Sequence, residues 1–268
     1  MSVGEKRARF RALHAAEELF LMPNPWDVGS ARLLESFGFP ALATTSAGFA
    51  LTLGKLDGGV TRDELVAHVA ELAAATSVPL NVDSERCFPD EPGGVAWTVE
   101  LLGEAGAAGF SVEDYDPGGD RIDDVGVAAE RVAAAASVAH GLAEPMVLTA
   151  RAENHLHGVD DLEDTISRLV AYRDAGADVV YAPGLADLAQ IARVVDEVGL
   201  PVNVLALPSV PSVSELASAG VRRVSTGSLL ANAAYAALQA GAVELQADGT
   251  SSYGRARIAA ADLRAAFL

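Results

Sequence analysis

The protein has 268 residues and only one cysteine, so it is too long for a disulfide-stapled miniprotein and long enough to bury a large core. Hydrophobic residues make up 50% and charged residues 21% of the chain, which excludes an intrinsically disordered protein. The 19 Lys and Arg against 37 Asp and Glu give a net charge of −18. This charge argues against a general nucleic-acid or anionic-membrane partner, and it would repel a small anionic substrate unless a cation or an arginine attracted it.

The N-terminal residues predict no secretory signal, because residues 1–11 are charged and lack an apolar run. Residues 224–243 carry no charge, but they begin with a Ser-Thr-Gly-Ser turn and contain Asn232 and Gln239. We expect a buried helix there rather than a membrane span. With Cys87 as the single thiol, the sequence favours a cytoplasmic protein.

Short apolar runs alternate with Ala-rich amphipathic stretches along the whole chain. An extra helix is expected at 5–19, before the first strand. The runs predict eight strands, at 20–23, 41–45, 80–82, 109–112, 146–150, 179–181, 202–205 and 223–225. The stretches predict helices at 28–37, 62–76, 93–105, 125–140, 162–175, 185–198, 213–219 and 229–240.

Several helices end in a glycine that is followed at once by a strand, as at Gly106, Gly176 and Gly220. Glycine closes a helix in the left-handed conformation, and the next residues enter the strand. Eight such units in one chain without a Pro-, Gly- or Ser-rich linker predict a single (β/α)8 TIM barrel over residues 1–268. A doubly wound open sheet is the competing fold.

The active site of such a barrel lies at the C-terminal ends of its strands, so residues directly after each strand are site candidates. Asp83 and Glu85 end the third predicted strand, and Glu113 ends the fourth. Three carboxylates at neighbouring strand ends, without His or Cys nearby, suit Mg²⁺, with Mn²⁺ as a substitute. Ordinary helix caps and surface ion pairs are the alternative.

Arg151 follows the fifth predicted strand and can grip a substrate carboxylate with its two-pronged guanidinium. A structural ion pair with Glu113 or Glu153 is the alternative. Three small residues, Ser46, Ala47 and Gly48, directly follow the second strand. Their backbone N–H groups can bind an anion, although a tight turn also needs small residues.

Asp57 lies in the Gly-rich segment 54–59. A glycine-flanked loop over a barrel mouth can act as a lid that carries one functional acid, although a plain surface turn fits the sequence nearly as well.

Together these segments resemble the isocitrate lyase/phosphoenolpyruvate mutase superfamily, in its small phosphoenolpyruvate-mutase-like branch. The resemblance spans roughly residues 18–240. It rests on Pro-Asn-Pro-Trp-Asp at 23–27, Thr-Thr-Ser-Ala-Gly at 44–48, Asp-Ser-Glu at 83–85, Val-Glu-Asp at 112–114 and Ala-Arg-Ala-Glu at 150–153. Further matches lie at 175–178, 183–184, 203–206 and 220–225.

The resemblance implies an α/β barrel whose eighth helix is swapped between subunits of a dimer or tetramer. It implies Mg²⁺ bound by Asp83, Glu85 and Glu113, and a lid aspartate at Asp57. The residues that it implies around a 2-oxo acid substrate are Thr45, Ser46, Ala47, Gly48, Arg151 and Asn203. The implied chemistry is cleavage of a bond to C3 of the substrate through a metal-stabilised pyruvate enolate.

Two departures narrow the reaction that the resemblance implies. Residues 115–122 contain no Cys, His or Lys, whereas the family's isocitrate and methylisocitrate lyases carry a Lys-Lys/Arg-x-Cys-Gly-His motif there. Pro183-Gly184 stands where those lyases place a Glu. We therefore expect C–C cleavage or oxaloacetate-type decarboxylation of a small 2-oxo or 2-hydroxy dicarboxylic acid. The alternatives are a phosphonomutase or phosphonopyruvate hydrolase and a non-catalytic barrel that binds 2-oxo acids.

Overall fold

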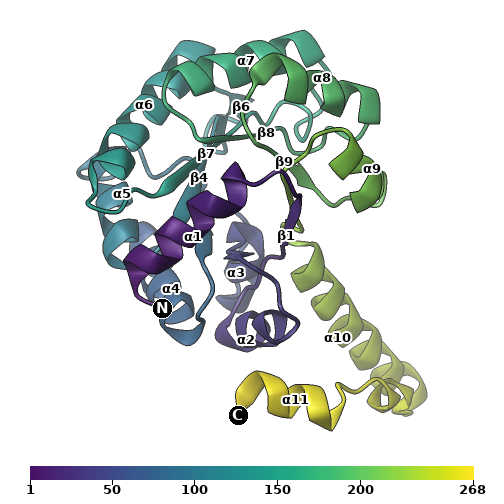
Figure 1. The fold of residues 1–268 in the computed structure, drawn as a ribbon. Helices are drawn as coiled ribbons and strands as arrows, with labels where there is room; N and C mark the ends of the chain where they lie inside the picture. The colour runs from purple at the N-terminus through teal and green to yellow at the C-terminus, as the bar shows by residue number, and fades with distance from the viewer.

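The computed structural model describes residues 1–268, and eight parallel strands form an almost closed barrel at its centre (Figure 1). Neighbouring strands follow the order β1-β10-β9-β8-β7-β4-β3-β2. They are β1 (Phe20–Met22), β2 (Leu42–Ala43), β3 (Leu80–Asp83), β4 (Gly109–Glu113), β7 (Val147–Arg151), β8 (Val179–Tyr181), β9 (Val202–Leu205) and β10 (Arg223–Ser225). Every expected strand is present, so the predicted (β/α)8 barrel is confirmed and the open sheet is wrong.

Helices surround the barrel, and most of them follow the strand after which the sequence pattern predicted a helix. They are α1 (Val3–Ala15), α2 (Val28–Ser36), α3 (Ser46–Thr52), α4 (Arg62–Ala75), α5 (Gly94–Glu104), α6 (Val125–Gly141), α7 (Leu162–Asp174), α8 (Leu188–Val198), α9 (Val213–Ser218), α10 (Leu229–Asp248) and α11 (Ala260–Phe267), with a 3-10 turn η1 (Ser252–Arg255). The sequence patterns did not predict α3, η1, α11 or the hairpin of β5 (Tyr115–Asp116) and β6 (Arg121–Ile122).

Asn24 closes the barrel between β10, β1 and β2. Its Nδ2 donates to the Thr44 carbonyl at 2.7 Å, and its Oδ1 accepts from the backbone N–H of Thr226 and of Gly227, both at 2.9 Å. The Ala43 N–H also donates to the Pro23 carbonyl at 3.1 Å. One buried amide thereby joins the two strands that no regular ladder connects.

Helix α1 covers the N-terminal end of the barrel. Lys6 Nζ donates to the Ala73 and Thr76 carbonyls, and Arg7 donates to the Gly103 and Ala107 carbonyls. Ala73, Thr76 and Gly103 lie at the C-terminal ends of α4 and α5, where carbonyls lack helical partners and attract cations. Phe10 of α1 is fully buried among apolar residues of the barrel interior, so α1 forms a plug.

The interior of the barrel changes from apolar near α1 to polar toward the opposite mouth. Phe10, Phe20, Met22, Ala41, Ala43, Ala108, Val147 and Val179 form one buried apolar cluster. Asn81, Ser111, Thr149, Asn203, Arg223 and Ser225 are polar residues of the strands that are also buried. Burying polar groups costs free energy unless they are hydrogen-bonded. An apolar layer would fill the barrel as well, so the packing of the core does not explain this polar layer.

Helix α10 does not close over the barrel but extends away from it, and α11 folds back toward α2 (Figure 1). Only Ala231 and Gly241 of its 20 residues are buried. Leu238, Val243 and Leu245 remain exposed, at 67%, 58% and 52%. Most of the helical part of the uncharged stretch 224–243 is therefore exposed in a single subunit, and its expected burial against a partner subunit stays a prediction. None of the helices is both long and apolar enough to span a membrane.

Candidate active site

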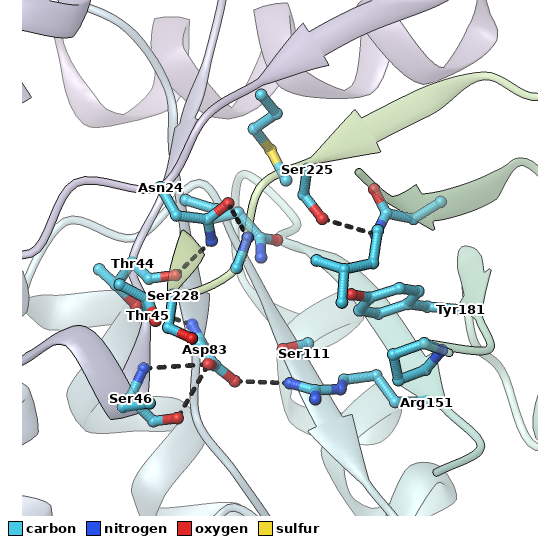
Figure 2. A pocket seen from close by; sticks show the side chains of 18 of the residues that line it. Asn24, Thr44, Thr45, Ser46, Asp83, Ser111, Arg151, Tyr181, Ser225 and Ser228 are labelled. Carbon is cyan, nitrogen blue, oxygen red and sulfur yellow. Dashed lines mark hydrogen bonds and ion pairs between the residues drawn. The ribbon is translucent and has the colours of Figure 1, made fainter. Parts of the chain in front are cut away.

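A cavity of about 140 Å³ opens at the C-terminal ends of the strands and reaches into the polar layer of the barrel. Figure 2 shows the side chains around it, with Arg151 and Asp83 meeting across the opening. Residues from all eight strand ends or the loops after them line it, among them Asn24, Thr45, Ser46, Asp57, Asn81, Asp83, Ser111, Arg151, Tyr181, Asn203, Arg223 and Ser225. The site therefore lies where the barrel rule placed it.

Arg151 is the central cation of this cavity. Its Nη1 lies 2.8 Å from Asp83 Oδ1 and 3.3 Å from Glu113 Oε2, and its Nε lies 2.7 Å from Glu153 Oε1. The guanidinium also stacks over the ring of Tyr181, with 5.3 Å between its carbon and the ring centroid. Burial opposes the charge, but Glu153, Glu113 and Asp83 outweigh it and raise the pKa of Arg151. Arg151 is thus cationic and tightly positioned.

Behind Arg151 lies a buried network that the sequence analysis did not detect. Glu153 is only 2% exposed, and its backbone N–H donates to Asp114 Oδ1 at 2.9 Å. Asp114 Oδ2 accepts from the Tyr172 hydroxyl at 2.6 Å and from Arg168 at 3.2 Å. Glu153 and Asp114 belong to the motifs Ala-Arg-Ala-Glu and Val-Glu-Asp, but the α7 partners of Asp114, Arg168 and Tyr172, come together with it only in the folded chain.

Asp83, Glu85 and Glu113 lie close enough to influence one another but do not form a ready ligand set. No group of three or more His, Cys, Asp or Glu side chains is arranged to hold a metal ion. Asp83 turns toward Arg151 and Ser46, whose N–H and hydroxyl donate to Asp83 Oδ2 at 3.0 and 3.1 Å. Glu113 also pairs with Arg151.

Glu85 carries the strongest sign of a cation site. Burial, together with the charges of Asp83 and Asp57, raises the pKa of Glu85 to about 7. Its backbone has a φ of 50°, which costs a non-glycine residue roughly 1–2 kcal/mol. Such strain persists where the surrounding structure requires it and is frequent at functional sites. Crowded oxygen donors of this kind fit Mg²⁺ chemically, because a divalent cation would relieve their repulsion.

The segment after β2 is the start of a helix. Thr45 is the N-cap of α3, and its side chain accepts from the Gly48 N–H at 3.3 Å. Gly48 is buried and does not line the cavity; a Cβ there would lie 3.1 Å from Ala231 of α10. Because Ser46 and Gly48 N–H groups have partners in the protein, Ala47 alone keeps a backbone donor at this helix end. The expected three-residue anion nest is therefore reduced.

The two remaining expected residues, Asp57 and Asn203, both line the cavity. Asp57 also borders a second, outer cavity with Glu85 and Glu113. Partial burial and the charge of Asp83 raise the pKa of Asp57. Asn203 donates to Ser225 Oγ at 2.9 Å and accepts from Arg223 Nε at 2.9 Å. Asp57 thus lies at the mouth and Asn203 in the interior.

The outer cavity has a wall that the sequence did not predict. The hairpin of β5 and β6 brings Tyr115 against His157 from the loop after β7, with ring centroids 3.5 Å apart and an interplanar angle of 15°. Both rings line this cavity together with Glu85, Glu113 and Arg151. His157 thus reaches the outer cavity from the loop after β7, a contact with Tyr115 that no local motif reveals.

The fold and the site define a (β/α)8 barrel whose mouth holds an arginine among carboxylates. The family model for phosphoenolpyruvate phosphomutase matches residues 10–246. A "Probable 2-methylisocitrate lyase 2" of Corynebacterium glutamicum is 32% identical to this chain. The matched region covers 72% of this chain and 64% of that protein. An oxaloacetate decarboxylase of Paraburkholderia xenovorans is 30% identical, and the matched region covers 83% of this chain and 75% of that protein.

A solved structure from Burkholderia cenocepacia J2315, described only as a lyase/mutase, has a TM-score of 0.92. It is 48% identical and covers 98% of this chain and 95% of its own. The chain belongs to the phosphoenolpyruvate phosphomutase family, within the isocitrate lyase/phosphoenolpyruvate mutase superfamily. The resemblance inferred from the motifs is confirmed, and the protein is an enzyme of a superfamily whose members are lyases or mutases.

Proposed function

We propose that the protein is a Mg²⁺-dependent lyase that acts on a small 2-oxo or 2-hydroxy dicarboxylic acid. It breaks a bond to C3, by C–C cleavage or by decarboxylation of an oxaloacetate-like acid. The observation that carries this proposal is Arg151, a cation held at the mouth between Asp83, Glu113 and Glu153. In a protein of net charge −18, such a group is what an anionic substrate needs.

The residues of the site suit the steps of this reaction. Arg151 donates two N–H groups to a substrate oxygen and stabilises negative charge as a bond to C3 breaks. For a 2-oxo acid the electron pair of that bond moves onto the C2 oxygen, and for a 2-hydroxy acid the pair of the C2–C3 bond moves toward the C4 carboxylate as C2 becomes a carbonyl. The Ala47 N–H supplies a further donor for the substrate carboxylate. Asp57 faces the same cavity, and its raised pKa suits a group that returns a proton to C3.

Asp83, Glu85 and Glu113 would hold Mg²⁺, or Mn²⁺ in its place, which when bound supplies Lewis-acid stabilisation worth several kcal/mol. Support for this comes from the crowding of these carboxylates and the strained backbone of Glu85. Because Asp83 and Glu113 also pair with Arg151, we expect metal binding to depend on ionic strength and pH.

Proton and phosphorus NMR of a substrate panel tests the proposal. The panel contains oxaloacetate, alkylated malates and phosphonopyruvate, each with Mg²⁺ and with a chelator. We expect a pyruvate-type or other 2-oxo product from a diacid, lost with chelator and in the Asp83→Ala variant. Release of phosphate or a rearranged phosphonate would instead assign C–P chemistry. Binding of oxalate without turnover of any panel member would assign a non-catalytic barrel.

A further inference from the structure

Arg223 is a buried cation on the inner wall of the cavity. It lies on β10, is 2% exposed and lines the same cavity as Arg151. Its Nε donates to Asn203 Oδ1 at 2.9 Å and its Nη2 to Thr149 Oγ1 at 3.0 Å, while its Nη1 lies 3.1 Å from His14 Nε2 of the α1 plug. All three partners are neutral polar groups.

No carboxylate neutralises this charge, since none of the ion pairs of the structure includes Arg223. Burial lowers the pKa of His14 to about 3, so His14 is a neutral acceptor at neutral pH. Burial also lowers the pKa of Arg223, to about 9, which still leaves it protonated there. A buried and unpaired charge costs several kcal/mol of solvation free energy. An anionic ligand that binds beside Arg223 would offset this cost.

Other buried cations of the protein are compensated in ways that Arg223 is not. Arg131 pairs with Asp123, and Arg62 lies 3.2 Å from Glu91. Lys6 and Arg7 donate to carbonyls at the ends of α4 and α5, where the helix dipoles favour a cation. Arg223 alone combines a position on the cavity wall with neutral partners only.

The guanidinium also has donors to spare. It carries five N–H groups, and three of them account for the contacts with Asn203, His14 and Thr149. One N–H on each terminal nitrogen therefore remains for a ligand. N–H donors on the two terminal nitrogens of a planar guanidinium can pair with the two oxygens of a carboxylate.

We propose that Arg223 binds the second carboxylate of a dicarboxylic acid, at the inner end of the cavity whose mouth carries Arg151. This inference rests on the proposed function and adds the residue that selects diacids over monoacids. A carboxylate held by a guanidinium resists leaving as CO₂, because its charge would be lost next to a cation. The group bound at Arg223 is therefore retained in the product, which favours C–C cleavage at another bond.

Calorimetric titration with malate and 2-hydroxybutyrate tests this assignment, because the two acids differ only in a terminal carboxylate or methyl group. Magnesium is held constant, and proton NMR of the recovered sample detects any turnover. We expect the wild type to prefer malate, and Arg223→Met to reduce that preference by about 10- to 100-fold. The neighbouring Arg222→Met removes the same charge from a half-buried side chain that does not line the cavity, and it should keep the preference.

Folding of the variant is controlled by circular dichroism, and Arg223→Lys provides a second variant that keeps a cation with fewer donors. We expect it to retain part of the preference. Chloride should compete with malate in the wild type more strongly than a bulky anion at equal ionic strength. An unchanged preference in folded Arg223→Met overturns the assignment. It does so even when a crystal soak shows a bromide site beside Arg223. Failure of the wild type to bind either acid would instead overturn the proposed function.

Discussion

Arg151 joins Asp83 and Glu153 through different nitrogens of one guanidinium, at 2.8 and 2.7 Å. Asp83 faces the inner cavity, whereas Glu153 is almost fully buried and borders only the outer cavity. The rear contact therefore holds the side chain in place while the front contact can be exchanged for a substrate oxygen or loosened by a metal ion. The structural ion pair that the sequence left open is therefore present, and it is compatible with the substrate role that we propose for Arg151.

Replacement of Arg151 by Lys should abolish most turnover while leaving the barrel folded. A lysine keeps the charge but cannot contact Glu153 and a substrate oxygen with separate donors. We expect kcat/KM to fall about 10²- to 10³-fold, the usual effect of losing a donor to a developing negative charge. The exposed Arg193→Lys, on α8, serves as control and should show wild-type kinetics. A full rate in Arg151→Lys would refute this role.

Mg²⁺ should raise the melting temperature of the protein, and Glu85→Gln should remove most of this effect. At a concentration hundredfold above Kd, binding stabilises the folded state by about 2.7 kcal/mol, which for a chain of this size is about 5–10 °C. Differential scanning fluorimetry with Mg²⁺ and with chelator measures the shift. Glu163→Gln, an exposed change on α7, should respond as the wild type does. Equal shifts in both variants would contradict a metal site at Glu85.

His14 should make the protein sensitive to acid. Burial and the charge of Arg223 lower its pKa from 6.5 to about 3, so between these values the unfolded chain binds a proton that the folded chain does not. Stability contributed by neutral His14 is therefore lost as pH falls below 6.5, by at most about 1.4 kcal/mol per pH unit. His14→Gln should flatten this decline in urea unfolding measured from pH 7 to pH 4. The exposed His140→Gln is the control.

We propose that the apolar surface of α10 is covered by a second copy of the chain, in a dimer or tetramer. Exposed Leu238, Val243 and Leu245 lie on a helix that extends from the barrel (Figure 1), and exposed large apolar side chains on such an element favour a protein interface. Leu238→Glu with Leu245→Glu should shift the protein toward monomers in light scattering after size exclusion. Val127→Glu, on the exposed side of α6, should leave the assembly unchanged. A wild-type monomer would rule out the proposed interface.

The eight strands could be predicted because the sequence pattern that marks each strand lies within the strand and the residues next to it. A short apolar run followed by a helix and a glycine stop has the same physical meaning wherever it occurs, and the barrel rule then places Asp83, Glu113 and Arg151 at one end. The missed α3 shows the limit, since Ser46–Thr52 starts with small residues that suit a turn equally well. Its N-cap Thr45 was the available signal.

The amino-acid sequence alone therefore determined the fold class, the family and the end of the barrel that carries the site, because hydrophobic periodicity and strand-end motifs depend on neighbours in the chain. The tertiary structure decided that Arg151 separates the carboxylates, that His157 stacks on Tyr115 at the outer cavity and that Arg223 lacks a counter-ion. These contacts depend on the register between strands and on the α1 plug, which bring together residues as distant as His14 and Arg223. Charge pairing at such distances along the chain leaves no periodic signal.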